Sequence, residues 1–154
     1  MEYRSITPQE DAAVAALIRG SLEKRGLNIP GTAYCDPGLD HLSDYYAAPG
    51  RAYYVLTDGN TVIGGVGLAE FDGDCCELQK LYLAEERQGR GLSYEMIRFI
   101  EEKAREMGYR RIYLETHTGL QAAIHVYERA GYRQVPKPAS VVHSAMDRFY
   151  IREL

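Results

Sequence analysis

A change of hydrophobic period in the middle of the chain constrains the fold most. Residues Cys76–Leu83 read C-E-L-Q-K-L-Y-L, which is typical of a β-strand. Ser93–Met107 instead places apolar residues at helical spacing with charges opposite, and Gly108 ends the pattern, which predicts an amphipathic helix. Arg111–His117 returns to a strand pattern. The three segments predict one βαβ unit with parallel strands and a right-handed crossover.

The flanking segments add further strands and helices. Thr7 and Glu10 have the spacing of a capping box around Pro8, so we expect a helix to begin there. Asp36-Pro37 predicts the cap of a second, short helix. Further strands are predicted at Met1–Ile6, Arg51–Thr57, Thr61–Glu70 and Asp147–Glu153, and a further helix at Gln121–Ala130. We therefore predict a single α/β domain over residues 1–154, with a mixed, mostly antiparallel sheet of about six to seven strands, one central parallel pair and about four helices.

Composition narrows the class of protein. The net charge of -4 argues against a nucleic-acid surface. The cysteines, Cys35, Cys75 and Cys76, form no C-x-x-C pair, which favours a reducing compartment with free thiols. No apolar signal region or membrane span is found, and the histidines show no metal-ligand spacing. We expect a soluble cytoplasmic protein that binds no nucleic acid, no membrane and no metal.

The turn before the central helix is the strongest candidate for a binding site. Gly89 and Gly91 allow backbone N–H groups to approach a ligand, and the helix that follows directs its free N–H groups to the same place. Such a turn binds pyrophosphate, and Arg87 and Arg90 can add positive charge. A tight structural turn remains an alternative. The segment is not a P-loop, and Tyr94 stands where a dinucleotide fingerprint needs its third glycine.

The string Q-G-R-G-L-S within this turn resembles the Q/R-x-x-G-x-G/A signature of the GNAT superfamily of N-acetyltransferases. Gln88 and Gly91 fill the first and fourth positions, and Ser93 replaces the usual Gly or Ala of the sixth with another small residue. The resemblance extends over Cys76–Tyr132, including E-L-Q-K-L-Y-L, L-E-T and A-A-I-H-V-Y-E-R-A-G-Y. It implies a GNAT-like fold in which the two parallel strands splay apart.

The same resemblance implies acetyl-CoA as co-substrate. Pantetheine is expected to enter the gap between the splayed strands and to contact Leu81, Tyr82 and Leu83. The pyrophosphate arm is assigned to the turn and the first helical residues, namely Gln88, Gly89, Arg90, Gly91, Leu92, Ser93 and Tyr94.

Acetyl transfer to an amine requires groups that move protons. An aliphatic amine has a pKa of ~10.4 and must lose a proton before its nitrogen can attack a thioester. Glu77, Glu115 or a water relay are the alternatives for the base. Tyr127 resembles the family tyrosine beside the CoA sulfur, where an acid would protonate the leaving thiolate. A backbone N–H near Leu81 is expected to stabilise the oxyanion.

The acceptor site is expected in two segments outside the cofactor core, Asn28–Tyr46 and Gln134–Arg148. The predicted activity is transfer of an acetyl group from acetyl-CoA to a primary amine of a small molecule, amino acid or peptide, by direct attack, in a monomer or homodimer. A non-catalytic acyl-CoA sensor and a nucleotide-binding oxidoreductase are the alternatives. The residues that could face the amine are Tyr34, Tyr45, Tyr46, His143 and Asp147.

Overall fold

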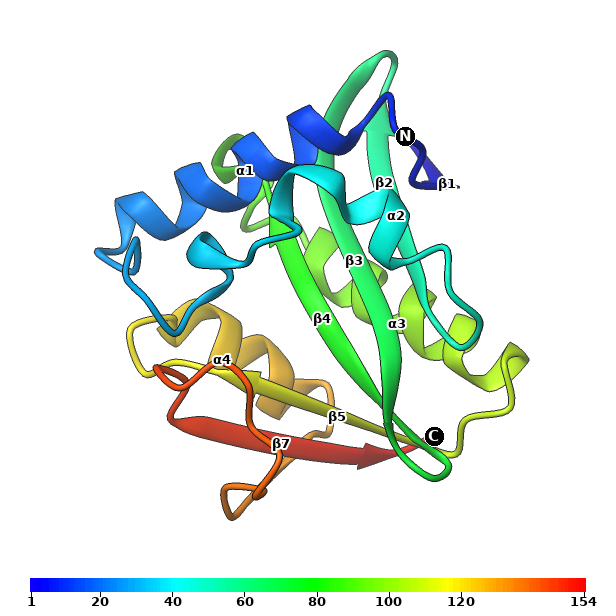
Figure 1. Cartoon of the computed structure of the whole chain (residues 1–154), viewed down its shortest axis with the longest axis vertical. Coiled ribbons are helices and arrows are strands. Elements are labelled where there is room, and N and C mark those ends of the chain that lie inside the picture. The colour runs from blue at the N-terminus through cyan, green and yellow to red at the C-terminus, as the bar shows by residue number, and fades with distance from the viewer.

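Seven strands form one mixed sheet in the computed structural model, which describes residues 1–154 (Figure 1). Their order across the sheet is β1-β2-β3-β4-β5-β7-β6, and all neighbours are antiparallel except β4 and β5. The strands are β1 (Glu2–Ser5), β2 (Ala52–Asp58), β3 (Thr61–Asp72), β4 (Cys75–Leu83), β5 (Arg111–Thr116), β6 (Arg133–Val135) and β7 (Arg148–Glu153).

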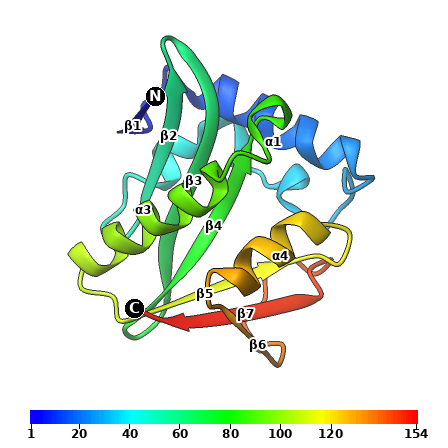
Figure 2. The same ribbon diagram turned by 180° about the vertical axis from the view of Figure 1, so that it is seen from behind.

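Helices cover both faces of this sheet. One face carries α1 (Asp11–Lys24) and the short α2 (Leu42–Tyr45), whereas α3 (Leu92–Glu106) and α4 (Gln121–Arg129) cover the other (Figure 2). Each face has its own apolar core, because alternate residues of a strand point to opposite sides. Val55 packs with α1, while its neighbour Leu56 packs with α3. Short 3₁₀ helices lie at Ala33–Cys35, Leu39–His41 and Glu85–Arg87.

The predicted fold class is confirmed, including the parallel βαβ unit and its helix boundaries to within one residue. Two local predictions were wrong, and one short strand was missed. The first helix begins at Asp11, because Thr7 and Glu10 bond each other in a turn that precedes it. Asp36 caps no helix, since Gly38 stands before the next one. The short strand β6 was not predicted, because three residues carry too little periodicity.

The parallel strands β4 and β5 pair along only part of their length. Cys75, Cys76 and Glu77 of β4 lie opposite Arg111, Ile112 and Tyr113 of β5, and no pair follows although both strands continue. We call Cys75–Glu77 the closed half of β4 and Leu78–Leu83 its open half. Figure 1 shows the two strands diverging from their common end. The predicted splayed pair is therefore present.

A β-bulge bends the open half. Gly65 and Gly67 of β3 lie opposite Tyr82 and Gln79 of β4, so one residue of β3 faces two of β4, namely Lys80 and Leu81. Lys80 has a φ of 50°, in the left-handed region that lysine seldom adopts. A bulge of this kind increases the local twist and turns the strand away from its previous course.

Tyr53 of β2 holds the bulge in place. Its ring crosses β3 and its hydroxyl donates a hydrogen bond of 2.8 Å to the carbonyl oxygen of Lys80. The crossing requires glycine in β3, because a Cβ atom would lie 2.5 Å from the Tyr53 ring atoms or hydroxyl at either Gly65 or Gly67. Tyr53 is only 1% exposed, so the strained backbone is fixed from inside the core.

Candidate active site

The gap between β4 and β5 opens into a cavity of about 490 Å³. The open half of β4, the end of β5, α4 and the segment before β7 all contribute to its walls. Five of the predicted site residues line it: Glu77, Leu81, Tyr82, Glu115 and Tyr127. Predicted site residues from β4, β5 and α4 therefore meet at the place where the strands separate.

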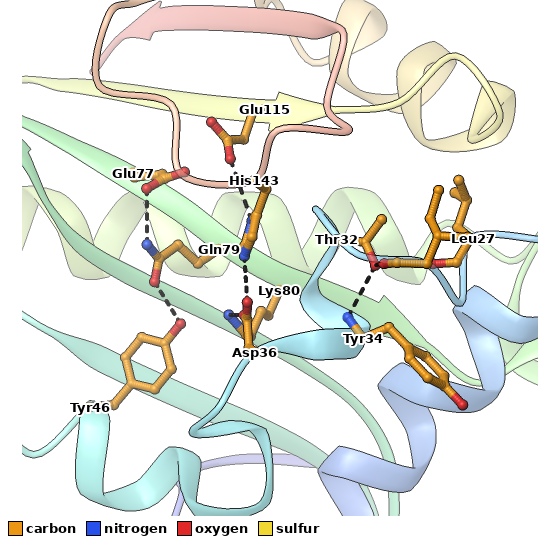
Figure 3. A network of polar contacts seen from close by, with 11 residues as sticks. Leu27, Thr32, Tyr34, Asp36, Tyr46, Glu77, Gln79, Lys80, Glu115 and His143 are labelled. Carbon is orange, nitrogen blue, oxygen red and sulfur yellow. Dashed lines mark hydrogen bonds and ion pairs between the residues drawn. The ribbon is translucent and has the colours of Figure 1, made fainter.

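Glu77 lies at the junction of the closed and open halves of β4. Burial raises the pKa of its carboxyl group to about 7, with a smaller contribution from the charge of Glu115. Gln79 donates a hydrogen bond of 2.9 Å to Glu77 Oε1, and Tyr46 donates one of 2.7 Å to Gln79 Oε1. This chain orients the carboxylate and leaves it without a cationic partner (Figure 3). A carboxyl group that titrates near neutral pH is suited to accept a proton.

A second polar chain crosses the cavity from Asp36 to Glu115. Asp36 binds Lys80 Nζ at 2.8 Å and His143 Nε2 at 2.8 Å, and His143 Nδ1 lies 3.5 Å from Glu115 Oε1 (Figure 3). The hydrogen bond to Asp36, followed by that to Glu115, raises the pKa of His143 to about 9. Burial alone would raise the pKa of Asp36, but His143 and Lys80 together lower it. Tyr113 Oη donates to the other oxygen of Glu115 at 3.2 Å.

Tyr127 reaches the cavity from α4. Its side chain is 6% exposed, and burial raises the pKa of its phenol well above the ordinary value. The hydroxyl therefore stays protonated and can donate a hydrogen bond to a thiolate that forms beside it. Because a thiolate is a weaker base than this phenolate, full transfer of the proton requires that another group return a proton to Tyr127. Tyr132 packs edge-on against the ring at a centroid distance of 6.0 Å and limits its movement.

The glycine turn lies outside this cavity, at the beginning of α3. Gly89 and Gly91 have φ values of 74° and 81°, which only glycine adopts readily. No side chain caps α3, so its first N–H groups are free to bind an anion. Gln88 is half-buried, and its side-chain amide donates to Leu83 O at 3.0 Å, which ties the turn to the end of β4.

Other candidates near the turn take different positions. Arg90 is exposed, whereas Arg87 pairs with Asp58 at 2.8 Å. Leu92, the first residue of α3, is buried, and Ser93 beside it is half-buried. Leu83 is 6% exposed in the core rather than in the cavity, and Tyr94 lines a separate hollow between α3 and α4.

Of the residues predicted to face an acceptor, some lie at the cavity and others do not. Tyr45 and His143 line the cavity, and Tyr46 contacts it through Gln79. Tyr34 instead donates to Glu23 of α1, and Asp147 accepts hydrogen bonds from Thr118.

Sequence reasoning missed four residues that shape the site: Asp36, Tyr53, Gln79 and Lys80. Each acts through a partner far along the chain, such as His143 for Asp36 or Lys80 for Tyr53. The glycines of β3 were the one available signal, because a strand with several glycines indicates a close approach by another group.

Residues 1–154 contain neither a cluster of metal-binding side chains nor a membrane-spanning helix. No three His, Cys, Asp or Glu side chains are grouped so that they could hold a metal ion. None of the helices combines the length and the apolar character needed to cross a membrane.

Comparison with known proteins gives consistent results. The model of the acetyltransferase (GNAT) family matches residues 23–132. The uncharacterized N-acetyltransferase YjgM of Escherichia coli (strain K12) is 40% identical over 136 residues, which cover 86% of this chain and 81% of that protein.

Solved structures share the fold at low sequence identity. An acetyltransferase from Streptococcus agalactiae 2603 superposes with a TM-score of 0.87 at 18% identity, covering 99% of this chain and 98% of the other. A PaiA N-acetyltransferase from Thermoplasma acidophilum, solved in complex with coenzyme A, superposes with a TM-score of 0.77 at 13% identity, covering 99% and 98%.

Proposed function

Because the chain belongs to the acetyltransferase (GNAT) family, we propose that residues 1–154 act as one domain that transfers the acetyl group of acetyl-CoA to a primary amine by direct attack on the thioester. One observation carries the proposal: the cavity between the splayed strands brings Glu77, Glu115 and Tyr127 together beside the open half of β4. A bound coenzyme A in a structural relative supports the choice of acyl donor.

The cofactor is assigned by the chemistry of its parts. The free amides at the start of α3, with Gly89 and Gly91, suit the pyrophosphate. The gap beside Leu81 and Tyr82 is a path for the pantetheine arm, whose amides need backbone partners that a splayed strand leaves available. The thioester would then lie near Tyr127.

The reaction is assigned to named groups. Glu77 accepts a proton from the acceptor ammonium, and the free amine attacks the thioester carbonyl carbon. The N–H of Leu81, beside the bulge, stabilises the oxyanion. When the C–S bond breaks, Tyr127 protonates the sulfur and regains a proton from the new amide nitrogen. The proton on Glu77 passes to solvent, so one proton is released in each turnover. We assign Glu115 to fixing His143 rather than to the base, since the two are in contact.

The test is to incubate the protein with acetyl-CoA and a panel of primary amines, measuring thiol release and the mass of the product. An acetylated amine is expected, formed at a rate that depends on protein concentration. Binding of acetyl-CoA without thiol release for any amine would instead indicate a sensor of the same fold.

A further inference from the structure

Among the charged side chains that line the cavity, carboxylates outnumber cations, and both cations are already paired. Its cations are Lys80 and His143, whereas its carboxylates are Asp36, Glu70, Glu77 and Glu115. Each cation is already bound by a cavity carboxylate: Lys80 by Asp36 at 2.8 Å, and His143 by Asp36 at 2.8 Å and Glu115 at 3.5 Å. No lining cation is left to receive an anion.

The carboxylates, in contrast, are not all neutralised from within the cavity. Glu70 pairs with Arg51 outside it, but Glu77 meets only the amide of Gln79. The other end of that amide accepts from Tyr46, so Gln79 cannot turn over and become an acceptor toward a ligand without breaking two hydrogen bonds. Glu77 thus presents a fixed, unpaired acceptor to whatever enters.

These contacts discriminate between ligands by charge. An ammonium group that approaches Glu77 gains a charged hydrogen bond. A carboxylate on the carbon next to that ammonium would lie among like charges with no free cation, and a half-buried anion without a partner is costly. The remaining walls are uncharged and largely apolar or aromatic, with Phe71, Val142 and Met146 among them. They offer no further charge to compensate.

We propose that the acceptor is a primary amine on an apolar or aromatic body that has no carboxylate beside the amino group, so that free α-amino acids are excluded. This inference rests on the function proposed above and narrows its acceptor class. It makes Asp36 a specificity residue, since Asp36 is the anion that occupies both Lys80 and His143.

The first test uses pairs of substrates that differ only in that carboxylate. Tyramine is compared with tyrosine, phenethylamine with phenylalanine, and tryptamine with tryptophan, by thiol release with acetyl-CoA. For each pair, kcat/KM of the amine is expected to exceed that of its amino acid by about tenfold or more. Equal or higher values for the amino acids would overturn the inference and leave the acetyltransferase function intact. No release with any of these compounds or with the wider amine panel would overturn both.

The second test frees the two cations. In Asp36→Asn, Lys80 and His143 lose their common anion, so the kcat/KM ratio of amino acid to amine is expected to rise about tenfold. Asp40→Asn is the matched control, because Asp40 pairs with Arg19 on the exposed surface and does not line the cavity. An unchanged ratio in a folded Asp36→Asn variant would contradict the specificity role. The substrate pairs test the acceptor class on the wild-type protein even if this variant does not fold.

Discussion

The closed and open halves of β4 belong to one strand but satisfy their backbones differently. In the closed half, Cys75–Glu77 pair with β5 on one side and β3 on the other, and both cysteines are buried. In the open half, β3 remains the only strand neighbour, and the other edge faces the cavity. The contrast shows that when a strand pairs over only part of its length, the backbone amides of the unpaired part are left available to a ligand.

Different residues keep the two halves in their states. The closed half is held by strand pairing and by Asp74, whose carbonyl accepts from the amides of Arg110 and Arg111 at 2.8 and 3.2 Å. Besides its pairing with β3, the open half depends on side chains: Tyr53 donates a hydrogen bond to the Lys80 carbonyl, and Asp36 forms an ion pair with the Lys80 ammonium. Changes of side chain should therefore affect the open half more than the closed half.

The largest effect is expected at the junction of the two halves. Glu77→Gln removes the proposed base and should lower kcat/KM by about 100- to 1,000-fold. The wild-type rate should rise with pH through about 7 as the carboxylate forms, and the variant should lose that step. Steady-state kinetics across pH measures both. If Glu115→Gln reduces the rate more than Glu77→Gln, the two carboxylates have been assigned in the wrong order.

The carboxyl group of Glu77 should also make stability depend on pH, but stability should fall with rising pH where the rate rises. The pKa of Glu77 is raised from 4.5 to about 7, so the folded protein binds more protons than the unfolded chain between these values. The free energy of unfolding should therefore fall as pH rises through this window, by about 3 kcal/mol at most. Urea unfolding of wild type and Glu77→Gln from pH 4.5 to 8 isolates this contribution. If the free energies of unfolding of the two proteins depend on pH in the same way, the pKa of Glu77 is not raised by burial at the junction.

The turn that follows the open half and the turn that precedes the closed half are compared by making the same change, glycine to glutamate, in each. Gly91→Glu puts a negative charge and a side chain where the pyrophosphate is assigned, and should weaken acetyl-CoA binding by about 100-fold. Gly73→Glu is the matched control in the turn before the closed half, since Gly73 also has a positive φ and open space around it. Calorimetric titration measures both. A similar loss in the two variants would mean that backbone strain, not the site, causes it.

The contact of Tyr53 with the bulge is tested by placing a methyl group in the space that Gly65 leaves for the Tyr53 ring. Gly65→Ala places a Cβ atom 2.5 Å from the Tyr53 hydroxyl, and should lower the free energy of unfolding by about 2 kcal/mol. Gly20→Ala is the control of opposite sign: it lies in α1 with no atom within 4 Å and should stabilise by about 1 kcal/mol. Chemical denaturation distinguishes them, and an unaffected Gly65→Ala would show that the ring of Tyr53 moves freely.

The smallest effect is expected at Tyr127. Thiolates leave readily, so Tyr127→Phe should lower kcat only about tenfold and leave the affinity for acetyl-CoA nearly unchanged. The ring stays in place against Tyr132. Parallel binding and rate measurements separate the two quantities. A wild-type kcat would remove the proposed acid from the mechanism.

Much of the fold and part of the site could be predicted from the sequence. The βαβ unit, the glycine turn and the hairpins are encoded locally, and the confirmed mixed sheet with one parallel pair follows from them. Glu77, Glu115 and Tyr127 were assigned by motif, and all three line one cavity. The Asp36–His143 contact joins residues 107 positions apart, and no local pattern signals such a pair. The bulge at Lys80 was equally hidden, because its cause is a tyrosine on another strand.

The extra residue in β4 has a consequence for how such a sheet gains or loses its pocket. If Lys80 were deleted, Leu81 would follow Gln79 directly. Gln79 would stay opposite Gly67 of β3, and Leu81 would come to lie opposite Val66 in regular register. The strand would then run straight and lie alongside β5 for longer. We therefore expect the loss of this one residue, with the carboxylates and Tyr127 unchanged, to narrow the gap between β4 and β5 in which the thioester is proposed to lie.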